Sequence, residues 1–164
     1  MTGNRSEALA RLDVFVGEWV VEARFPGQPA PPGAAGYGPV ARSWFEWALG
    51  RQFLLQRTEV PVPEAPDGLM IVGADPESGG YTQHYYDSRG VARVYQMSLA
   101  AGVWKVWRDA PGFWQRYTGL ISADGTSVTG AWEYSPDGVS WRHDFSLTYL
   151  AAARPASPPN NQNR

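Results

Sequence analysis

Between residues 82 and 96 the chain reads TQHYYDSRGVARVYQ, which is the pattern of two short strands around a tight turn. Ser88-Arg89-Gly90 suits a three-residue loop, because glycine takes the positive φ angle of the last loop position without steric cost. Such a loop would place His84 opposite Val94. The hairpin therefore predicts an antiparallel sheet and indicates which side chains share a face with His84.

Similar turn sequences recur along the chain, so the pairing can be extended from strand to strand. They are Ala100-Ala101-Gly102, Pro111-Gly112, Ala123-Asp124-Gly125 and Pro136-Asp137-Gly138. Because residues directly opposite one another lie on the same face, these turns predict two neighbouring rows on the face of His84. The first row is His84, Val94, Arg108, Gln115, Glu133 and Trp141. The second row is Thr82, Gln96, Val106, Tyr117, Ala131 and His143.

The last strand indicates which face points inward. Apolar and aromatic residues alternate there with polar ones: Trp141, His143, Phe145, Leu147 and Tyr149 against Arg142, Asp144, Ser146 and Thr148. The face of His84 is therefore predicted to be the inner one. A slip of one residue in any turn would reverse this assignment downstream.

The segments before residue 82 complete an all-β pattern. We expect a short amphipathic helix over residues 4–16, a strand from Gly17, and a hairpin about Leu49-Gly50-Arg51, with Pro-rich loops at 26–39 and 61–67. In that hairpin, Phe45, Trp47, Leu54, Gln56 and Thr58 would face inward. The chain thus predicts a closed antiparallel up-and-down barrel of about ten strands, with the helix plugging its base and the Pro-rich loops at its mouth. We expect a single domain over residues 1–150 and a polar, poorly ordered tail over 151–164.

Composition narrows the function classes. The 164 residues carry a formal net charge of −2, so no basic surface for nucleic acid is indicated. The absence of Cys excludes thiol catalysis, disulfides and Cys-ligated zinc, and is typical of a reducing compartment. We find no signal-peptide pattern and no apolar run long enough to cross a membrane. We expect a cytoplasmic protein.

Gly17-Glu18-Trp19 follows the predicted helix and resembles the Gly-x-Trp signature of lipocalin and calycin barrels. The resemblance implies that Trp19 closes the barrel base under an Arg from the end of the last strand, for which Arg154 is the candidate. Together with residues 45–50, 84–88 and 143–149, the pattern resembles a bacterial family of lipocalin-like barrels over roughly residues 6–150. The haem-binding nitrobindin barrels are more distantly similar, but their axial-histidine segment matches neither His84 nor His143.

A barrel of this kind predicts a small-molecule pocket, in which a few oriented polar groups lie among apolar walls. The candidate ligand-binding residues are His84, Tyr86, Arg108, Gln115, Tyr117, Glu133, Trp141, His143, Phe45, Trp47, Gln56, Gln96 and Trp104. Polar groups inside a barrel need partners, so Arg108 and Glu133 could pair structurally across Gln115. Alternatively, they could hold the polar part of an apolar or amphipathic ligand. The two interpretations are compatible.

Three further alternatives remain open. His84, Tyr86 and Glu133 could act as acid and base in an isomerase or cyclase reaction. A haem held by one His is possible, whereas a metal site is not expected, because the chain has only two His and no Cys. On the outer face, Tyr85, Arg93, Tyr95, Trp107, Arg116, Trp132 and Arg142 would form an aromatic and basic surface. Such a surface could join two copies of the chain through Tyr95, Trp107, Arg116 and Trp132.

Overall fold

The computed structural model describes residues 6–27 and 40–152, which fold into one short helical segment and ten strands. The α-helix α1 spans Glu7–Arg11 and continues as the 3-10 helix η1, Leu12–Phe15. The strands are β1 (Gly17–Arg24), β2 (Val40–Ala48), β3 (Phe53–Glu59), β4 (Gly68–Ala74), β5 (Tyr81–Asp87), β6 (Ala92–Ala100), β7 (Val103–Arg108), β8 (Trp114–Ile121), β9 (Ser127–Ser135) and β10 (Arg142–Ala151). Arg154, most of the 26–39 loop and the tail after residue 152 lie outside the described residues.

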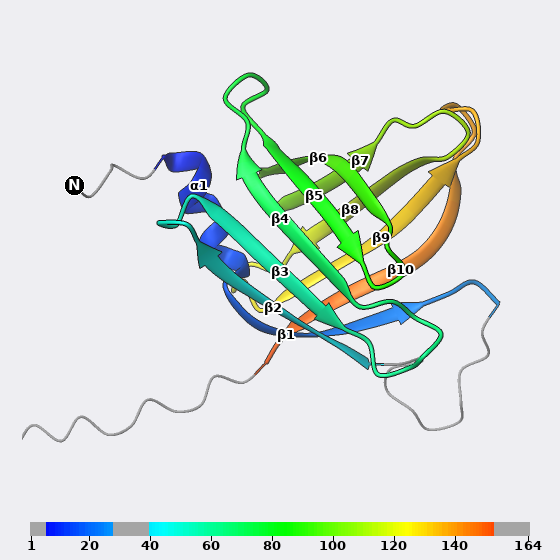
Figure 1. Ribbon diagram of the computed structural model, residues 1–164, viewed down its shortest axis with the longest axis horizontal. Coiled ribbons are helices and arrows are strands. Elements are labelled where there is room, and N and C mark those ends of the chain that lie inside the picture. Colours follow the sequence, from blue (N-terminus) through cyan, green and yellow to red (C-terminus); the bar gives the residue numbers. More distant parts are fainter. Residues whose placement is uncertain (1–5, 28–39, 153–164) are drawn as a thin grey trace, which may run out of the picture.

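Each strand pairs antiparallel with its neighbours in sequence, and β1 also pairs with β10, which closes the sheet into a barrel (Figure 1). The predicted all-β barrel of about ten strands is therefore confirmed. Closure leaves no free sheet edge, so the interior is reached only through the two ends of the barrel.

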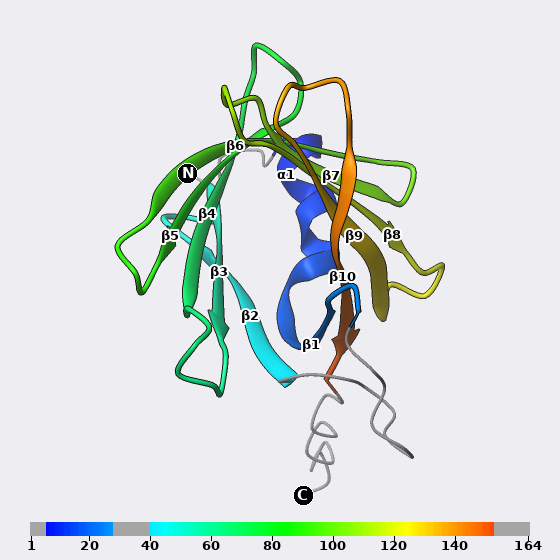
Figure 2. The same ribbon diagram turned by 90° about the vertical axis from the view of Figure 1, so that its right-hand side faces the viewer.

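The helical segment closes one of these ends. The Ser6 side chain caps α1 by accepting a hydrogen bond from the Leu9 backbone N–H at 3.2 Å. Leu12 and Phe15 are completely or almost completely buried. The Phe15 ring lies 4.7 Å from the Trp104 ring, centroid to centroid. Figure 2 shows the helix between the wall formed by β2–β5 and the wall formed by β7–β10. The predicted helical plug is confirmed.

Trp19 lies beside this plug at the start of β1. Its indole N–H donates a 2.7 Å hydrogen bond to the Phe15 carbonyl oxygen, and its ring meets Tyr149 edge-on. Only 3% of its surface is exposed. A large buried aromatic with its single donor satisfied ties the plug to the barrel wall.

The register departs from the sequence prediction after the first hairpin. His84 does pair with Val94, as expected. At the next turn, however, Ala100 pairs with Val103, so that only Ala101 and Gly102 form the loop. Both have positive φ angles, 51° and 74°, which define the two-residue turn that matches strand twist. Because the loop is one residue shorter than expected, the inner and outer faces of β5 and β6 are exchanged relative to the later strands. The face that carries His84 therefore points outward.

A second difference occurs between β8 and β9. The Asp124 carboxylate accepts hydrogen bonds from the side chains of Ser122 and Thr126, and Ser122 pairs with Ser127 around a four-residue loop. The extra residue places Glu133 opposite Arg116 and not beside Gln115. The predicted row is therefore broken here as well.

The third difference is a β-bulge at Asp144 in β10, between His143 and Phe145. The bulge changes the alternation within one strand. Phe145 faces the interior, as predicted, whereas His143 pairs with Glu133 on the outer face. Trp141 is also on the outside, where the Arg116 guanidinium lies 3.8 Å from its ring centroid.

Candidate binding cavity

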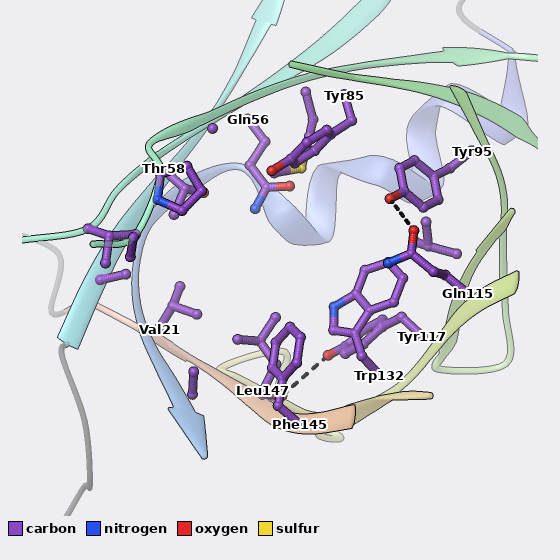
Figure 3. Close-up of a pocket in the computed structure, with 18 of the residues that line it drawn as sticks. Val21, Gln56, Thr58, Tyr85, Tyr95, Gln115, Tyr117, Trp132, Phe145 and Leu147 are labelled. Atoms are coloured by element: carbon purple, nitrogen blue, oxygen red, sulfur yellow. Dashed lines mark hydrogen bonds between the residues drawn. The ribbon is translucent and has the colours of Figure 1, made fainter. Parts of the chain in front are cut away.

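The barrel encloses a cavity of about 370 Å³ between the helical plug and the opposite opening. Figure 3 shows the side chains of β1, β3, β5, β6, β8, β9 and β10 surrounding this space. Apolar lining comes from Val21, Ala23, Phe25, Ala41, Val60, Ala65, Pro66, Met70, Trp104, Val106, Trp132, Phe145 and Leu147. Polar lining comes from Gln56, Thr58, Gln83, Tyr85, Arg89, Arg93, Tyr95, Gln115, Tyr117 and Tyr149. The size and the mixed lining are those of small-molecule sites.

Several interior polar groups have protein partners. Gln56 donates to the Ser43 hydroxyl at 3.2 Å, and Ser43 in turn bonds with the Thr58 hydroxyl. The Tyr117 hydroxyl donates to the Leu147 carbonyl oxygen at 3.4 Å. Burial raises the pKa of Tyr117 well above its usual range and raises the pKa of Tyr149 to about 12. Both phenols are therefore neutral at physiological pH.

Two other interior polar atoms have no hydrogen-bond partner among the described residues. They are the Gln83 carbonyl oxygen and the Trp104 indole nitrogen. Both residues line the cavity, with 5% and 4% of their surface exposed. One atom is an acceptor and the other a donor, so two residues of the cavity wall each keep a buried polar atom that no described residue satisfies.

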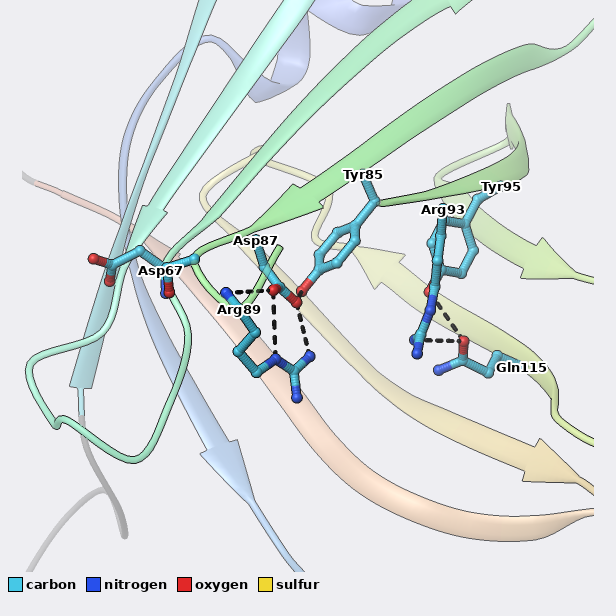
Figure 4. A network of polar contacts seen from close by, with 8 residues as sticks. Asp67, Tyr85, Asp87, Arg89, Arg93, Tyr95 and Gln115 are labelled. Carbon is cyan, nitrogen blue, oxygen red and sulfur yellow. Dashed lines mark hydrogen bonds and ion pairs between the residues drawn. The ribbon is translucent and has the colours of Figure 1, made fainter. Parts of the chain in front are cut away.

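At the mouth, a first polar group links Tyr85, Asp87 and Arg89 (Figure 4). The Tyr85 hydroxyl and the Arg89 guanidinium donate to Asp87 at 2.8 Å and 2.7 Å. Hydrogen bonding to Arg89 holds the pKa of Asp87 well below its usual range, while burial raises the pKa of Tyr85 to about 12. The charge of Arg89 is thus neutralised within its own hairpin.

The loop before β4 is attached to the same hairpin. The Asp67 backbone N–H donates to the Ser88 hydroxyl at 3.0 Å, and the Ser88 N–H donates to the Asp67 carbonyl oxygen at 2.9 Å. The Asp67 carboxylate also accepts from the Val60 N–H at 2.8 Å. These bonds fix Ala65 and Pro66 at the rim, where both line the cavity.

A second polar group at the mouth links β6 with β8, across the intervening strand β7. The Gln115 carbonyl oxygen accepts hydrogen bonds from the Tyr95 hydroxyl at 3.0 Å and from the Arg93 guanidinium at 3.3 Å. Figure 4 shows both donors directed at this oxygen. The Arg93 guanidinium also lies 5.8 Å from the Phe113 ring centroid. Arg93 is therefore held at the rim by a neutral acceptor and an aromatic ring.

Of the residues predicted to hold a ligand, the structure places Gln56, Trp104, Gln115 and Tyr117 in the cavity lining. Their contact with a ligand remains a prediction. Phe45 instead packs on Phe15 of the plug, and the Trp47 indole donates to Asp13 at 2.9 Å. Arg108 pairs with Gln115 as expected, but it is not part of the lining.

The other candidates were placed on the wrong face. His84, Tyr86, Gln96 and His143 are exposed, because the register shifts and the bulge turn them outward. Glu133 pairs with Arg116 at 3.0 Å on the outer face, so the expected pairing of Arg108 with Glu133 is wrong. Trp141 lies beside the same Arg116.

The positions of these residues affect two of the alternative functions, the isomerase or cyclase reaction and the binding of haem. His84, Tyr86 and Glu133 are all on the outer surface, so they cannot act together as acid and base inside the cavity. The two histidines are the only ones in the chain, and neither side chain can ligate a haem held in the interior. Among the described residues there is also no group of three or more His, Asp or Glu side chains placed to hold a metal ion.

The sequence reasoning missed several interior residues. Gln83, Tyr85, Arg93, Tyr95 and Trp132 line the cavity. The alternation within β6 contained the signal, because Tyr95, Met97 and Leu99 alternate with Gln96, Ser98 and Ala100. The proposed dimer surface is corrected accordingly: Tyr95 and Trp132 are interior, and only Trp107 and Arg116 are on the outer side. Dimerisation itself remains a prediction.

Comparisons with known proteins support the fold. Neither a protein-family model nor a curated protein sequence matches the chain. The structure is similar to the crystal structure of Rv2717c from M. tuberculosis, with a TM-score of 0.59 and 13% sequence identity. The match covers 92% of this chain and 100% of that chain. At such low identity, the similarity shows a shared barrel fold alone. No helix within residues 6–27 and 40–152 is long and apolar enough to span a membrane.

Proposed function

We propose that the protein binds a small, mainly apolar molecule inside the barrel. The observation that carries this proposal is that two residues of the cavity wall, Gln83 and Trp104, each keep a buried polar atom with no partner among the described residues. A buried polar group without a partner costs about 1–3 kcal/mol. A wall built only for stability would have paired these groups or replaced them with apolar ones.

A ligand with an acceptor and a donor among apolar atoms would satisfy both groups. The rest of the wall is aromatic and aliphatic, so the body of the ligand would gain mainly from leaving water. Closure of one end by the plug leaves the mouth, near Arg89 and Arg93, as the entrance. The resemblance of Gly17-Glu18-Trp19 to the lipocalin signature supports the same assignment.

The test is a fluorescence titration with phenylnaphthylamine, an uncharged apolar probe that brightens when it leaves water. We expect saturable binding of one probe per chain. Ala23→Trp should abolish it, because Ala23 lines the cavity and an indole there would fill the space. Thr129→Trp is the matched control, since Thr129 is exposed on β9 and should leave binding unchanged.

Binding that survives Ala23→Trp, or is lost equally in both variants, would count against an interior site. Native mass spectrometry of freshly purified protein offers an independent check. A co-purified small molecule should appear as an added mass on the parent chain and be missing from Ala23→Trp.

A further inference from the structure

Of the two arginines that line the cavity, Arg93 is the one that no carboxylate of the described residues neutralises. It is half-buried, lines the cavity and projects from β6 beside Tyr85 of β5. No salt bridge joins it to a carboxylate within residues 6–27 and 40–152, and the remaining segments of the chain contain no Asp or Glu. Arg89, its neighbour across the hairpin, is paired with Asp87. A cation withdrawn from part of its water favours an anionic partner.

Gln115 adds donors next to this charge. Its carbonyl oxygen is occupied by the Tyr95 hydroxyl and by Arg93, so the amide group is oriented with its two N–H bonds directed elsewhere. Within the described residues these N–H bonds have no acceptor. Arg93 and Gln115 therefore offer donors only, and a group that accepts several hydrogen bonds would satisfy them.

The charged residues of the cavity lining are all positive, like Arg93 itself. The chain has 16 acidic and 14 basic residues, yet the cavity is lined by two arginines and by no Asp, Glu or Lys. The Asp87 carboxylate at the mouth is paired with Arg89, so Arg93 leaves the lining with a net positive charge. Such a field attracts anions and repels cations.

We propose that the ligand is an amphipathic anion, with its apolar body in the barrel and its anionic head group at Arg93 and the Gln115 amide. This inference rests on the proposed function, because it assigns a polarity to the same site. Recognition would use charge-assisted hydrogen bonds from the guanidinium, supported by the amide N–H groups.

Two fluorescent probes separate the inference from the proposed function. Anilinonaphthalene sulfonate and phenylnaphthylamine share one apolar body and differ by the sulfonate. We expect the parent protein to bind the sulfonate more tightly. Arg93→Met should weaken sulfonate binding about tenfold or more, the effect of losing a charge-assisted hydrogen bond, and change phenylnaphthylamine binding less than about twofold. Decanoate should also displace phenylnaphthylamine at lower concentration than decan-1-ol.

Two further variants control for charge and for folding. Arg57→Met removes the same charge from the exposed outer face of β3 and should leave both probes unaffected. Gln115→Glu keeps the side-chain shape but gives Arg93 a carboxylate partner, so it should reproduce the selective loss of sulfonate binding. Urea midpoints for each variant identify any that is unfolded, and Gln115→Glu tests the proposal if Arg93→Met does not fold.

The outcomes are distinct. If neither probe binds the parent saturably, the proposed function fails and the inference fails with it. If both bind equally, and neither Arg93→Met nor Gln115→Glu discriminates between them, only the anionic head group is refuted. Equal weakening of the sulfonate by Arg57→Met would show that net charge, and not Arg93, controls binding.

Discussion

The ring of Tyr117 lies directly over Gly130 of the adjacent strand, in space that a side chain would fill. A β carbon at Gly130 would be 2.6 Å from the Tyr117 hydroxyl oxygen and would also clash with the Thr118 carbonyl oxygen. Gly130 pairs with Gly119, where a β carbon would lie 2.8 Å from the same ring. The two glycines therefore allow Tyr117 to pack closely on the sheet and leave the cavity open beside it.

We expect Gly130→Ala to destabilise the protein by about 1–3 kcal/mol, the usual cost of overpacking. The backbone carbonyl of Thr118 cannot move aside without disturbing the β8–β9 ladder. Gly68→Ala is the control, because a β carbon there makes only ordinary contacts, with the Met70 methyl group at 3.5 Å and with atoms of Tyr85 and Tyr86 at 3.8 Å. Urea unfolding of both variants gives the comparison. Similar midpoints for the two would contradict this role of Gly130.

Trp19→Ala should cost about 3–5 kcal/mol, because a buried indole is lost from between the plug and the barrel wall. Binding of phenylnaphthylamine by the fraction that stays folded should be unchanged, since Trp19 does not line the cavity. Chemical denaturation monitored by circular dichroism measures the effect. If the variant is as stable as the parent, Trp19 does not stabilise the barrel base.

Trp19→Phe separates packing from hydrogen bonding at the same position. The smaller ring keeps much of the apolar contact but leaves the Phe15 carbonyl oxygen without the indole donor. We expect a smaller loss than for Trp19→Ala, of about 1–3 kcal/mol. A loss as large as that of Trp19→Ala would assign most of the stabilisation to the hydrogen bond.

The class of fold and the plug could be predicted because they depend on alternation and on turn residues along the whole chain. Most of the candidate site could not, because it depends on the length of single turns and on the bulge in β10. Ala101 adopts a φ angle of 51°, which the sequence does not predict because alanine rarely takes positive φ angles. This conformation allows a two-residue loop in place of the expected three-residue loop. Asp124 lengthens another loop through its hydrogen bonds to Ser122 and Thr126. Each change moves a whole strand by one residue and exchanges its faces.

The first hairpin was predicted correctly, yet its faces were assigned wrongly. Its orientation was carried back from β10 to β6 through four turns, of which three differ in length from the expected loop. Within β6, Tyr95 and Met97 alternate with Gln96 and Ser98, and both are buried in the structure. This alternation is a local sequence signal that does not depend on the length of any turn. Alternation inside each strand is therefore the safer guide to the interior when turn lengths are ambiguous.

Asp87 should make stability depend on acid pH. Its pKa in the folded protein is held below the ordinary value of about 3.9, chiefly by the hydrogen bond to Arg89. A lowered folded-state pKa gives stability that is fully present above pH about 4 and is lost as pH falls toward the folded value. The parent should therefore be more stable than Asp87→Asn at neutral pH, and the difference should narrow progressively as the pH falls below about 4.

Urea unfolding from neutral to acid pH measures this difference. Asp109→Asn is the control, because Asp109 is exposed at the end of β7 and has no hydrogen bond within the described residues. Its difference from the parent should stay small throughout. A gap between the parent and Asp87→Asn that persists unchanged to low pH would show that the carboxylate charge is not the source.

Two glutamines of the cavity wall should respond in opposite directions to the same substitution. The Gln83 carbonyl oxygen is buried without a partner among the described residues, whereas the Gln56 amide donates to Ser43. Gln83→Met removes an unsatisfied acceptor and keeps a similar volume, so it should raise the free energy of unfolding of the empty protein by about 1 kcal/mol. Gln56→Met should lower it by about 1–3 kcal/mol, because the bond to the buried Ser43 hydroxyl is lost.

The glutamine pair also tests the site, because binding and stability should separate at Gln83. If that oxygen is held ready for a ligand donor, Gln83→Met should stabilise the empty barrel and weaken binding of phenylnaphthylamine, whose amine N–H is a donor. Calorimetric melting with and without the probe measures both effects on one sample. A Gln83→Met variant that loses stability as Gln56→Met does, and still binds the probe like the parent, would show that Gln83 serves the fold and not a ligand.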